Sequence, residues 1–262
     1  MKRYYLGLNA GGPGIKECLF GRGNARDVRD LSELIAKRYG GTPMLTKNGR
    51  SALCLALKAY FDGGDKIIIS GFTCYAVYEA VVEAGMTPIF ADINKNDLNF
   101  DIDTLETLIN TTTGRGAKGL IVQNTLGNPV DIQKISKFAK KHNLLIIEDL
   151  AHSTGVKYYG GKEVGTVGVA TALSFGKDKS INTVSGGAVV LRAPMKHEIE
   201  APSEHPRLAD YLRTRFYPLL TGISRGLNGI HLGGVLMRFF LATHMVERSA
   251  DSKLDLRSRP PK

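Results

Sequence analysis

Short apolar runs alternate with helical patterns through the middle of the chain. Seven such runs occur, at 43–46, 67–69, 88–92, 120–122, 144–147, 171–175 and 187–191. Helical patterns lie between several of them, at 49–60, 75–84 and 132–142. Strands without a polar side are buried on both faces, which is typical of a parallel or mixed sheet covered by helices. We therefore expect an α/β fold.

The chain of 262 residues carries a formal net charge of +10. Nucleic-acid-binding proteins often have such a balance, but here lysines and arginines alternate with acids and form no long block, so we expect no nucleic-acid partner. An anionic ligand also suits a basic surface. The cysteines Cys18, Cys54 and Cys74 lack the spacing of a disulfide framework or a zinc site, which favours a reducing compartment. No sustained apolar run follows Met1, so we expect no signal peptide.

The composition changes after about residue 200, and the stretch 208–246 is apolar and helical in pattern. Part of it, 226–246, is long enough to be considered as a membrane span, and Gly229 and Gly233 have the small-xxx-small spacing. Polar residues interrupt it, and Arg238 near its middle is costly in lipid. We therefore favour buried or interface helices and expect no stable membrane span.

Chemically useful side chains follow the apolar run at 144–147. Asp149 stands at its carboxyl end, where ligands gather in parallel sheets. A carboxylate in this position is partly desolvated and needs a cationic or hydrogen-bonding partner to stay ionised. Glu148 is expected to point to the opposite face of the strand, and His152 follows three residues after Asp149. The alternatives are a helix N-cap for Asp149 and a structural role for His152.

Two lysines, Lys177 and Lys179, follow the run at 171–175. Either can be a solvated loop residue or a nucleophilic amine. A lysine amine and a desolvated aspartate are the two groups that pyridoxal 5'-phosphate (PLP) requires from a protein. The lysine binds the aldehyde, and the aspartate keeps the pyridine nitrogen protonated. The residues alone do not choose between the two lysines.

Two earlier segments could complete such a site. In 48–53, Gly49 permits a close turn and Ser51 adds a hydroxyl at a helix start, where N–H groups attract anions. An ordinary helix cap explains this segment equally well. The segment 71–75 follows a strand and offers aromatic rings that could stack on a planar ligand. Taken singly, Phe72 and Tyr75 are more simply interpreted as core residues.

Four segments resemble the DegT/DnrJ/EryC1/StrS aminotransferases, in the order found in that family. They are Asn-Gly-Arg-Ser-Ala-Leu at 48–53, the stretch 65–92, Glu-Asp-Leu-Ala-His-Ser at 148–153, and Ser-Phe-Gly-Lys-Asp-Lys-Ser-Ile at 174–181 with the following Gly186-Gly187. The resemblance implies a fold type I PLP-dependent transferase with a mostly parallel seven-stranded sheet between helices. Residues 1–200 would form the PLP-binding large domain, and 201–262 the helical start of an incomplete C-terminal region.

The resemblance assigns Lys179, five positions after Ser174, as the lysine that binds PLP covalently. It pairs Asp149 with the pyridine nitrogen and places His152 beside the ring oxygen, so these three are the expected catalytic residues. The other cofactor-binding residues that it implies are Gly49, Arg50, Ser51, Cys74, Tyr75, Asn124 and Ser174, without a metal. Cys74 stands where the family often has an aromatic residue, which leaves open whether Phe72, Cys74 or Tyr75 faces the ring.

The implied activity is transfer of an amino group from an amino acid, expected to be glutamate, to a keto group of a nucleotide-linked sugar, as in polysaccharide biosynthesis. Family active sites take residues from a neighbouring subunit, which implies a homodimer, expected in the cytoplasm. Sugar dehydratases on this scaffold replace the lysine by histidine, so Lys179 favours transamination. Relatives are longer and close with a small C-terminal domain. The alternative is therefore a truncated, catalytically weak homologue that acts as a binding or regulatory subunit.

Overall fold

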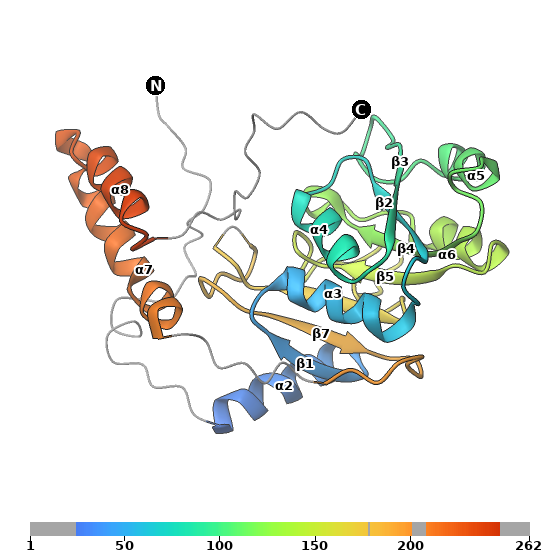
Figure 1. Ribbon diagram of the computed structural model, residues 1–262, viewed down its shortest axis with the longest axis horizontal. Helices are drawn as coiled ribbons and strands as arrows, with labels where there is room; N and C mark the ends of the chain where they lie inside the picture. The colour runs from blue at the N-terminus through green and yellow to red at the C-terminus, as the bar shows by residue number, and fades with distance from the viewer. Residues whose placement is uncertain (1–24, 178, 201–207, 247–262) are drawn as a thin grey trace.

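Seven strands form one sheet in the order β1-β7-β6-β5-β4-β2-β3. The computed structural model describes residues 25–177, 179–200 and 208–246 (Figure 1). The strands are β1 Thr42–Thr46, β2 Lys66–Ser70, β3 Thr87–Ala91, β4 Ala117–Gln123, β5 Leu145–Asp149, β6 Ala170–Ser174 and β7 Gly187–Leu191. Strands β2 to β6 are parallel, and only β7 runs against its two neighbours, β1 and β6. The predicted α/β fold with a mostly parallel, seven-stranded sheet is confirmed.

Helices cover both faces of the sheet (Figure 1). Helices α3 (Gly49–Tyr60) and α4 (Tyr75–Glu83) pack on one face, and α2 (Ala25–Tyr39), α5 (Ile102–Asn110) and α6 (Ile132–Lys141) pack on the other. Strand β2 is continuously apolar because its side chains enter a core on each face of the sheet. Ile67 and Ile69 enter the core beneath α3 and α4, whereas Ile68 enters the opposite core, and all three are fully buried.

The helix boundaries follow from local chemistry. Asp101 and Asp131 cap α5 and α6, because each side chain accepts a backbone N–H from the first turn of its helix. Helix α4 ends one residue earlier than predicted, and Gly85 follows with a φ of 86°, the left-handed conformation that favours glycine. Helices α2 and α5 were not predicted, although both are amphipathic.

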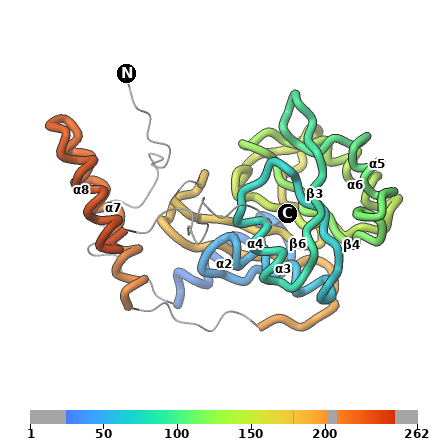
Figure 2. Tube along the Cα trace, turned by 45° about the horizontal axis from the view of Figure 1, so that its top comes forward, coloured from blue at the N-terminus to red at the C-terminus, as the bar shows by residue number. Residues whose placement is uncertain are grey.

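The segment 208–246 is helical, as predicted, with α7 (Leu208–Gly226), the 3-10 helix η2 (Leu227–Ile230) and α8 (Gly233–Ala242). Helices α7 and α8 lie side by side and outside the two helical layers of the sheet (Figure 2). They approach closely where the buried Ser224 Oγ donates to the Gly233 carbonyl at 2.6 Å. No helix among the described residues is long and apolar enough to cross a membrane. A domain boundary near residue 200 stays a prediction.

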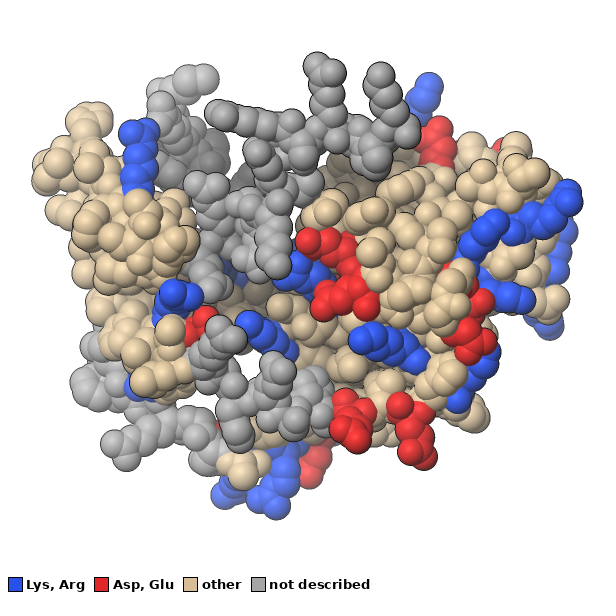
Figure 3. All heavy atoms as spheres, viewed as in Figure 1, with Lys and Arg blue, Asp and Glu red and all other residues tan. Residues whose placement is uncertain are grey.

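Charged side chains of both signs alternate over the face of the molecule in Figure 3. On this face, the net charge of +10 is therefore not gathered into one basic patch. A field that steers a polyanion requires charges of one sign that are concentrated in one patch. Binding of a small anionic ligand would instead depend on individual positive charges close to the sheet edge.

Candidate functional site

The strand ends that carry the predicted site residues meet at one edge of the sheet. Gln123, Asp149 and Ser174 end the neighbouring parallel strands β4, β5 and β6. Strand β7 starts at the same edge, because Gly187 pairs with Ser174, and β1 ends there, because Thr46 pairs with Gly187. Residues far apart in the sequence are therefore brought together where α/β proteins place their ligands.

Glycines let the start of α3 lie directly against the end of β6. A β-carbon on Gly49 would lie 2.5 Å from Ser174 Cβ and 2.9 Å from its Oγ, so no larger residue fits. On the other side, a β-carbon on Gly187 would lie 2.6 Å from the carbonyl carbon of Asn48. Gly187, the first residue of β7, is thus needed for close packing between two backbones.

The amino end of α3 and the Ser174 hydroxyl lie together and form a candidate anion cradle. Asn48 caps the helix, since its side chain accepts the Ser51 N–H at 2.8 Å. The first N–H groups of a helix have no partner within the helix and carry a partial positive charge, which suits a phosphate group. The segment is therefore both a helix cap, made by Asn48, and a geometrically suitable anion site.

Arg50 joins this cradle to the neighbouring helix. Its guanidinium forms an ion pair with Glu79 of α4, and both side chains are about three-quarters buried, with 27% and 24% exposed. The pair fixes the first turn of α3 against α4. A direct contact of the Arg50 side chain with a cofactor stays a prediction.

Asp149, His152 and Lys179 form one electrostatic cluster. Burial raises the pKa of the Asp149 carboxyl, and the Ala151 N–H at 2.9 Å and the charges of Lys179 and His152 act in the opposite direction. Burial also lowers the pKa of His152, as does Lys179, whereas Asp149 opposes this change. The cluster therefore combines a desolvated carboxylate with an amine and an imidazole. In such surroundings a carboxylate interacts strongly with a protonated ring nitrogen of a bound ligand.

A tight turn carries Lys179 back toward Ser174. The Lys179 N–H donates to the Gly176 carbonyl at 3.1 Å. A β-carbon on Gly176 would lie 3.8 Å from Ser174 Oγ and 3.9 Å from Lys179 Cγ, so these two side chains flank the same glycine. Lys177 instead places its Nζ 4.3 Å from the ring centroid of Tyr217 in α7. The two lysines that the residues alone could not separate thus have different surroundings.

The segment 71–75 lies at the rim of the site and is exposed. Phe72 and Tyr75 have 49% and 42% of their surface exposed, so the interpretation of these residues as core residues is wrong. The reason is that α4 buries Val77, Ala80 and Val81, which places Tyr75 on its outer side, where it stacks on Tyr78 at 5.4 Å. Cys74 precedes the helix and is exposed as well. Which of the three residues faces a ligand stays open.

Gln123, which the sequence did not point to, lies at the same sheet edge as the candidate site. Its side chain accepts the Thr73 hydroxyl at 2.5 Å and donates to the Phe72 carbonyl at 3.1 Å, which ties the loop after β2 to the end of β4. Asn124, the next residue, is fully buried, and its side chain accepts the Val130 N–H at 2.9 Å. Asn124 therefore closes the loop after β4, and its contact with a cofactor stays a prediction.

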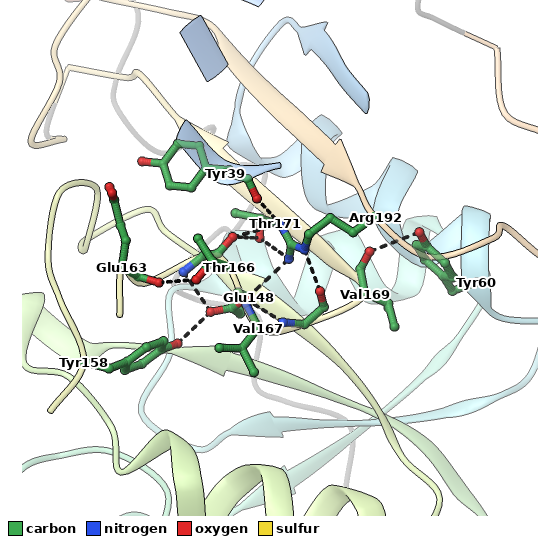
Figure 4. A network of polar contacts seen from close by, with 12 residues as sticks. Tyr39, Tyr60, Glu148, Tyr158, Glu163, Thr166, Val167, Val169, Thr171 and Arg192 are labelled. Atoms are coloured by element: carbon green, nitrogen blue, oxygen red, sulfur yellow. Dashed lines mark hydrogen bonds and ion pairs between the residues drawn. The ribbon is translucent and has the colours of Figure 1, made fainter. Parts of the chain in front are cut away.

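Glu148 is fully buried, and its carboxylate points toward Tyr158 and Val167 (Figure 4). Its carboxylate accepts four hydrogen bonds of 2.7–2.8 Å, from Tyr158 Oη and the backbone N–H groups of Gly165, Val167 and Gly168. Arg192 Nη2 lies 3.4 Å from Oε2 and donates to Thr171 Oγ1 at 2.7 Å. Burial raises the pKa of Tyr158, and the charge of Glu148 adds to this effect.

This network, which sequence reasoning also missed, joins β5, β6 and β7 directly behind the strand end that presents Asp149. No local pattern could reveal it, because the partners lie between ten and 44 residues from Glu148. Among the residues that the structure describes, no group of three or more His, Cys, Asp or Glu could hold a metal ion.

Replacing Asp149 by asparagine should stabilise the cofactor-free protein while weakening PLP binding. Because burial raises the pKa of Asp149, ionisation of this carboxyl lowers the free energy of unfolding. This loss is absent at pH values well below the ordinary aspartate pKa and complete at pH values above the raised pKa of the folded protein. Asp149→Asn removes the cost, so its advantage should be largest at neutral pH and shrink as the pH falls toward about 4. Urea unfolding at several pH values measures this. A less stable variant at neutral pH would mean that Asp149 mainly caps its turn.

Replacing Gly49 by alanine should remove the anion cradle. The added methyl would collide with Ser174 Cβ at 2.5 Å, so the start of α3 has to move away from β6. We expect a loss of stability of about 1–3 kcal/mol, as for other overpacked positions, together with weaker phosphate-dependent binding of PLP. Gly63→Ala is the matched control, because a β-carbon there meets nothing within 4 Å. Equal PLP affinity in both variants would contradict the assignment of the cradle.

The sequence profile of the DegT/DnrJ/EryC1/StrS aminotransferase family matches residues 27–205. The chain is 38% identical over 144 residues to a GDP-perosamine synthase of Escherichia coli O157:H7, covering 55% of this chain and 38% of that protein. It is 37% identical over 172 residues to UDP-4-amino-4,6-dideoxy-N-acetyl-beta-L-altrosamine transaminase of Helicobacter pylori, covering 64% and 44%. The chain thus spans less than half the length of these relatives.

The fold has counterparts among solved structures. One is a GDP-4-keto-6-deoxymannose-3-dehydratase with a trapped PLP-glutamate adduct, which aligns with a TM-score of 0.62 and 25% identity over 73% of this chain and 52% of that one. The expectation of a fold type I PLP-dependent transferase is confirmed.

Proposed function

The chain belongs to the DegT/DnrJ/EryC1/StrS aminotransferase family, and from this premise we propose that it is a PLP-dependent aminotransferase. The amino donor would be an amino acid, glutamate, and the acceptor a keto group of a nucleotide-linked sugar. The observation that carries the proposal is the cluster of Asp149, His152 and Lys179 beside the anion cradle of α3, all at one edge of the sheet.

The residues at this edge fit the chemical groups of PLP one by one. The amino end of α3 and Ser174 would hold the phosphate, and Asp149 would accept the ring N–H. Lys179 would bind the aldehyde, and His152 would lie beside the ring oxygen. When bound, PLP supplies an aldehyde that links to amines and a ring that spreads the negative charge of a deprotonated α-carbon.

Each catalytic side chain then has a defined task. Lys179 would hold the cofactor through its amine and, as a free amine, would move a proton at the donor's α-carbon. Asp149 would hold the proton on the ring nitrogen, and its desolvation would strengthen that interaction. The lowered pKa of His152 keeps its imidazole neutral near neutral pH, so it can hydrogen-bond without adding a charge beside Lys179.

The choice of substrates rests on relatives. The E. coli and H. pylori relatives are named for synthesis of nucleotide-linked amino sugars, and the solved dehydratase holds glutamate on its PLP. Because this chain has Lys179 where dehydratases of this scaffold have histidine, transamination is the better proposal. A homodimer in the cytoplasm is part of the same proposal, since family sites are completed by a second subunit.

A half-reaction with glutamate tests the proposal without knowledge of the acceptor. The full chain, loaded with PLP, should lose its visible absorption band when glutamate is added and release 2-oxoglutarate in an amount equal to the bound cofactor. Size-exclusion chromatography with mass detection should show a dimer. A chain that binds PLP but releases no keto acid from any amino acid would instead be the binding or regulatory subunit considered as the alternative.

A further inference from the structure

The exposed surface of α8 is apolar. Helices α7 and α8, with η2 between them, form a hairpin outside the helical layers of the sheet (Figure 2). The buried residues of α8 are Gly233 and Phe240. On another face, Leu232, Val235 and Phe239 have 53%, 61% and 56% of their surface exposed. Spacings of three and four residues place these three side chains next to one another along the helix.

Helix α6 shows what the exposed face of a helix in this chain contains elsewhere. Within Ile132–Lys141, every exposed residue is polar, namely Gln133, Lys134, Lys137, Lys140 and Lys141. Within Gly233–Ala242, Arg238 is the one exposed polar residue. A helix that is apolar on all sides is normally buried, and a contiguous exposed apolar patch marks an interaction site. The exposed face of α8 is therefore expected to bind a partner.

The formal charges of the hairpin are all positive beyond the first turn of α7. Residues 211–246 contain four arginines and no Asp or Glu. Asp210, in the first turn of α7, forms an ion pair with Arg213. Arg238 is exposed and directly precedes Phe239. An apolar face bordered by arginine is typical of a helix that lies in the interface of an anionic membrane.

A second copy of this chain is the other occupant to consider, and the charges disfavour it. A two-fold interface pairs a surface with itself, so the copy would bring the same arginines and no carboxylate from residues 211–246. Like charges that meet across an interface weaken it. An anionic lipid headgroup instead supplies negative charge next to Arg238, and the acyl chains accept an apolar side chain such as Phe239.

We propose that this hairpin docks the protein on the surface of an anionic lipid bilayer. Leu232, Val235 and Phe239 enter the boundary between headgroups and acyl chains, and Arg238 contacts the lipid phosphates. The docking is to the surface and not across it, because α8 has ten residues and a span needs about 20. Neither PLP nor a substrate takes part, so the docking does not rest on the proposed function.

Flotation of the full chain with lipid vesicles tests the docking directly. The chain should float with vesicles of equal parts phosphatidylcholine and phosphatidylglycerol, less so with phosphatidylcholine alone, and salt should weaken the binding. Phe239→Ser should lower the vesicle affinity about tenfold or more, the effect of losing one buried phenylalanine side chain. Arg238→Gln should lower it about fivefold, as expected for one arginine near an anionic surface. No flotation, or equal flotation with both kinds of vesicle, would overturn the proposal.

Phe90 provides the matched control. It lies in β3, outside the hairpin, and has 53% of its surface exposed, close to the value for Phe239. Phe90→Ser should leave the vesicle affinity unchanged. An equal loss of affinity in Phe90→Ser and Phe239→Ser would mean that the vesicles bind exposed aromatic residues without regard to the hairpin, which would overturn the proposal.

A single fluorophore locates the contact without removing an aromatic side chain. The sequence contains no Trp, so Phe239→Trp and Phe90→Trp each introduce one. On addition of anionic vesicles, the emission of Phe239→Trp should shift to the blue, whereas that of Phe90→Trp should not. Equal shifts in both variants would overturn the docking. It would also be overturned, in favour of an interface between two copies, if Phe239→Trp emitted in the blue without vesicles and Phe239→Ser lowered the mass in size-exclusion chromatography.

Discussion

Replacing Lys179 by alanine is expected to abolish the visible absorption band of lysine-bound PLP and to slow amino transfer by about 10²–10⁴-fold, the usual contribution of a positioned acid–base group. Lys179 is the amine that shares a cluster with Asp149 and His152, so its removal takes away both the covalent attachment and the proton carrier. The variant should still bind PLP through the α3 cradle, more weakly and without the band. Spectral titration with PLP and a glutamate half-reaction measure the two effects separately.

Lys177→Ala is the informative comparison for the absorption band. Lys177 lies over Tyr217 of α7, whereas the charge of Lys179 acts on both Asp149 and His152. The band should therefore survive in Lys177→Ala. If instead Lys177→Ala loses the band and Lys179→Ala keeps it, the attachment point has to be moved to Lys177, and the roles of the two lysines are exchanged.

Replacing Glu148 by alanine is expected to lower the free energy of unfolding by about 3–5 kcal/mol, the range found when one partner of a buried ion pair is removed. The substitution leaves Arg192 buried without its carboxylate and takes the acceptor away from Tyr158 and three backbone N–H groups. Unfolding in urea, followed by circular dichroism, gives the value. Domains of this size have a total stability of about 5–15 kcal/mol, so the variant is expected to be marginal.

Glu163→Gln serves as the control for this loss. Glu163 also pairs with an arginine, Arg38, but that side chain is 43% exposed, and exposed pairs contribute little because water screens them. A loss of stability at Glu148 no larger than at Glu163 would show that the buried network is not what holds β5, β6 and β7 together. The milder Glu148→Gln, which keeps part of the hydrogen bonding, should fall between the two.

The sequence predicts those features of the fold and the site that depend on a single strand or a single motif. Apolar runs such as 67–69 can only be buried on both faces, and this fixes the layered sheet without knowledge of any partner. The alternation of a strand likewise predicted that Glu148 and Asp149 face opposite sides. Family motifs placed Ser174, Lys179 and the α3 start in one site, and the structure brings these segments to one edge of the sheet.

The parts that could not be predicted depend on contacts between distant residues. Glu148 accepts hydrogen bonds because the turn at 165–168 and Arg192 lie against it. The local sequence around Glu148, the turn or Arg192 does not predict these contacts. Tyr75 was assigned to the core because aromatic residues are usually buried, yet α4 buries Val77, Ala80 and Val81 and leaves Tyr75 exposed.

Reduction of the PLP-loaded full chain with borohydride, followed by peptide mass spectrometry, tests the central claim most directly, because it fixes the cofactor to the amine that holds it. For the wild type we predict one pyridoxyl group per chain, attached to Lys179. In the Lys179→Ala variant we predict no pyridoxyl group at position 179. The assignment of the active site would be contradicted by a label on Lys177, by labels scattered over surface lysines in proportion to their exposure, or by no label at all.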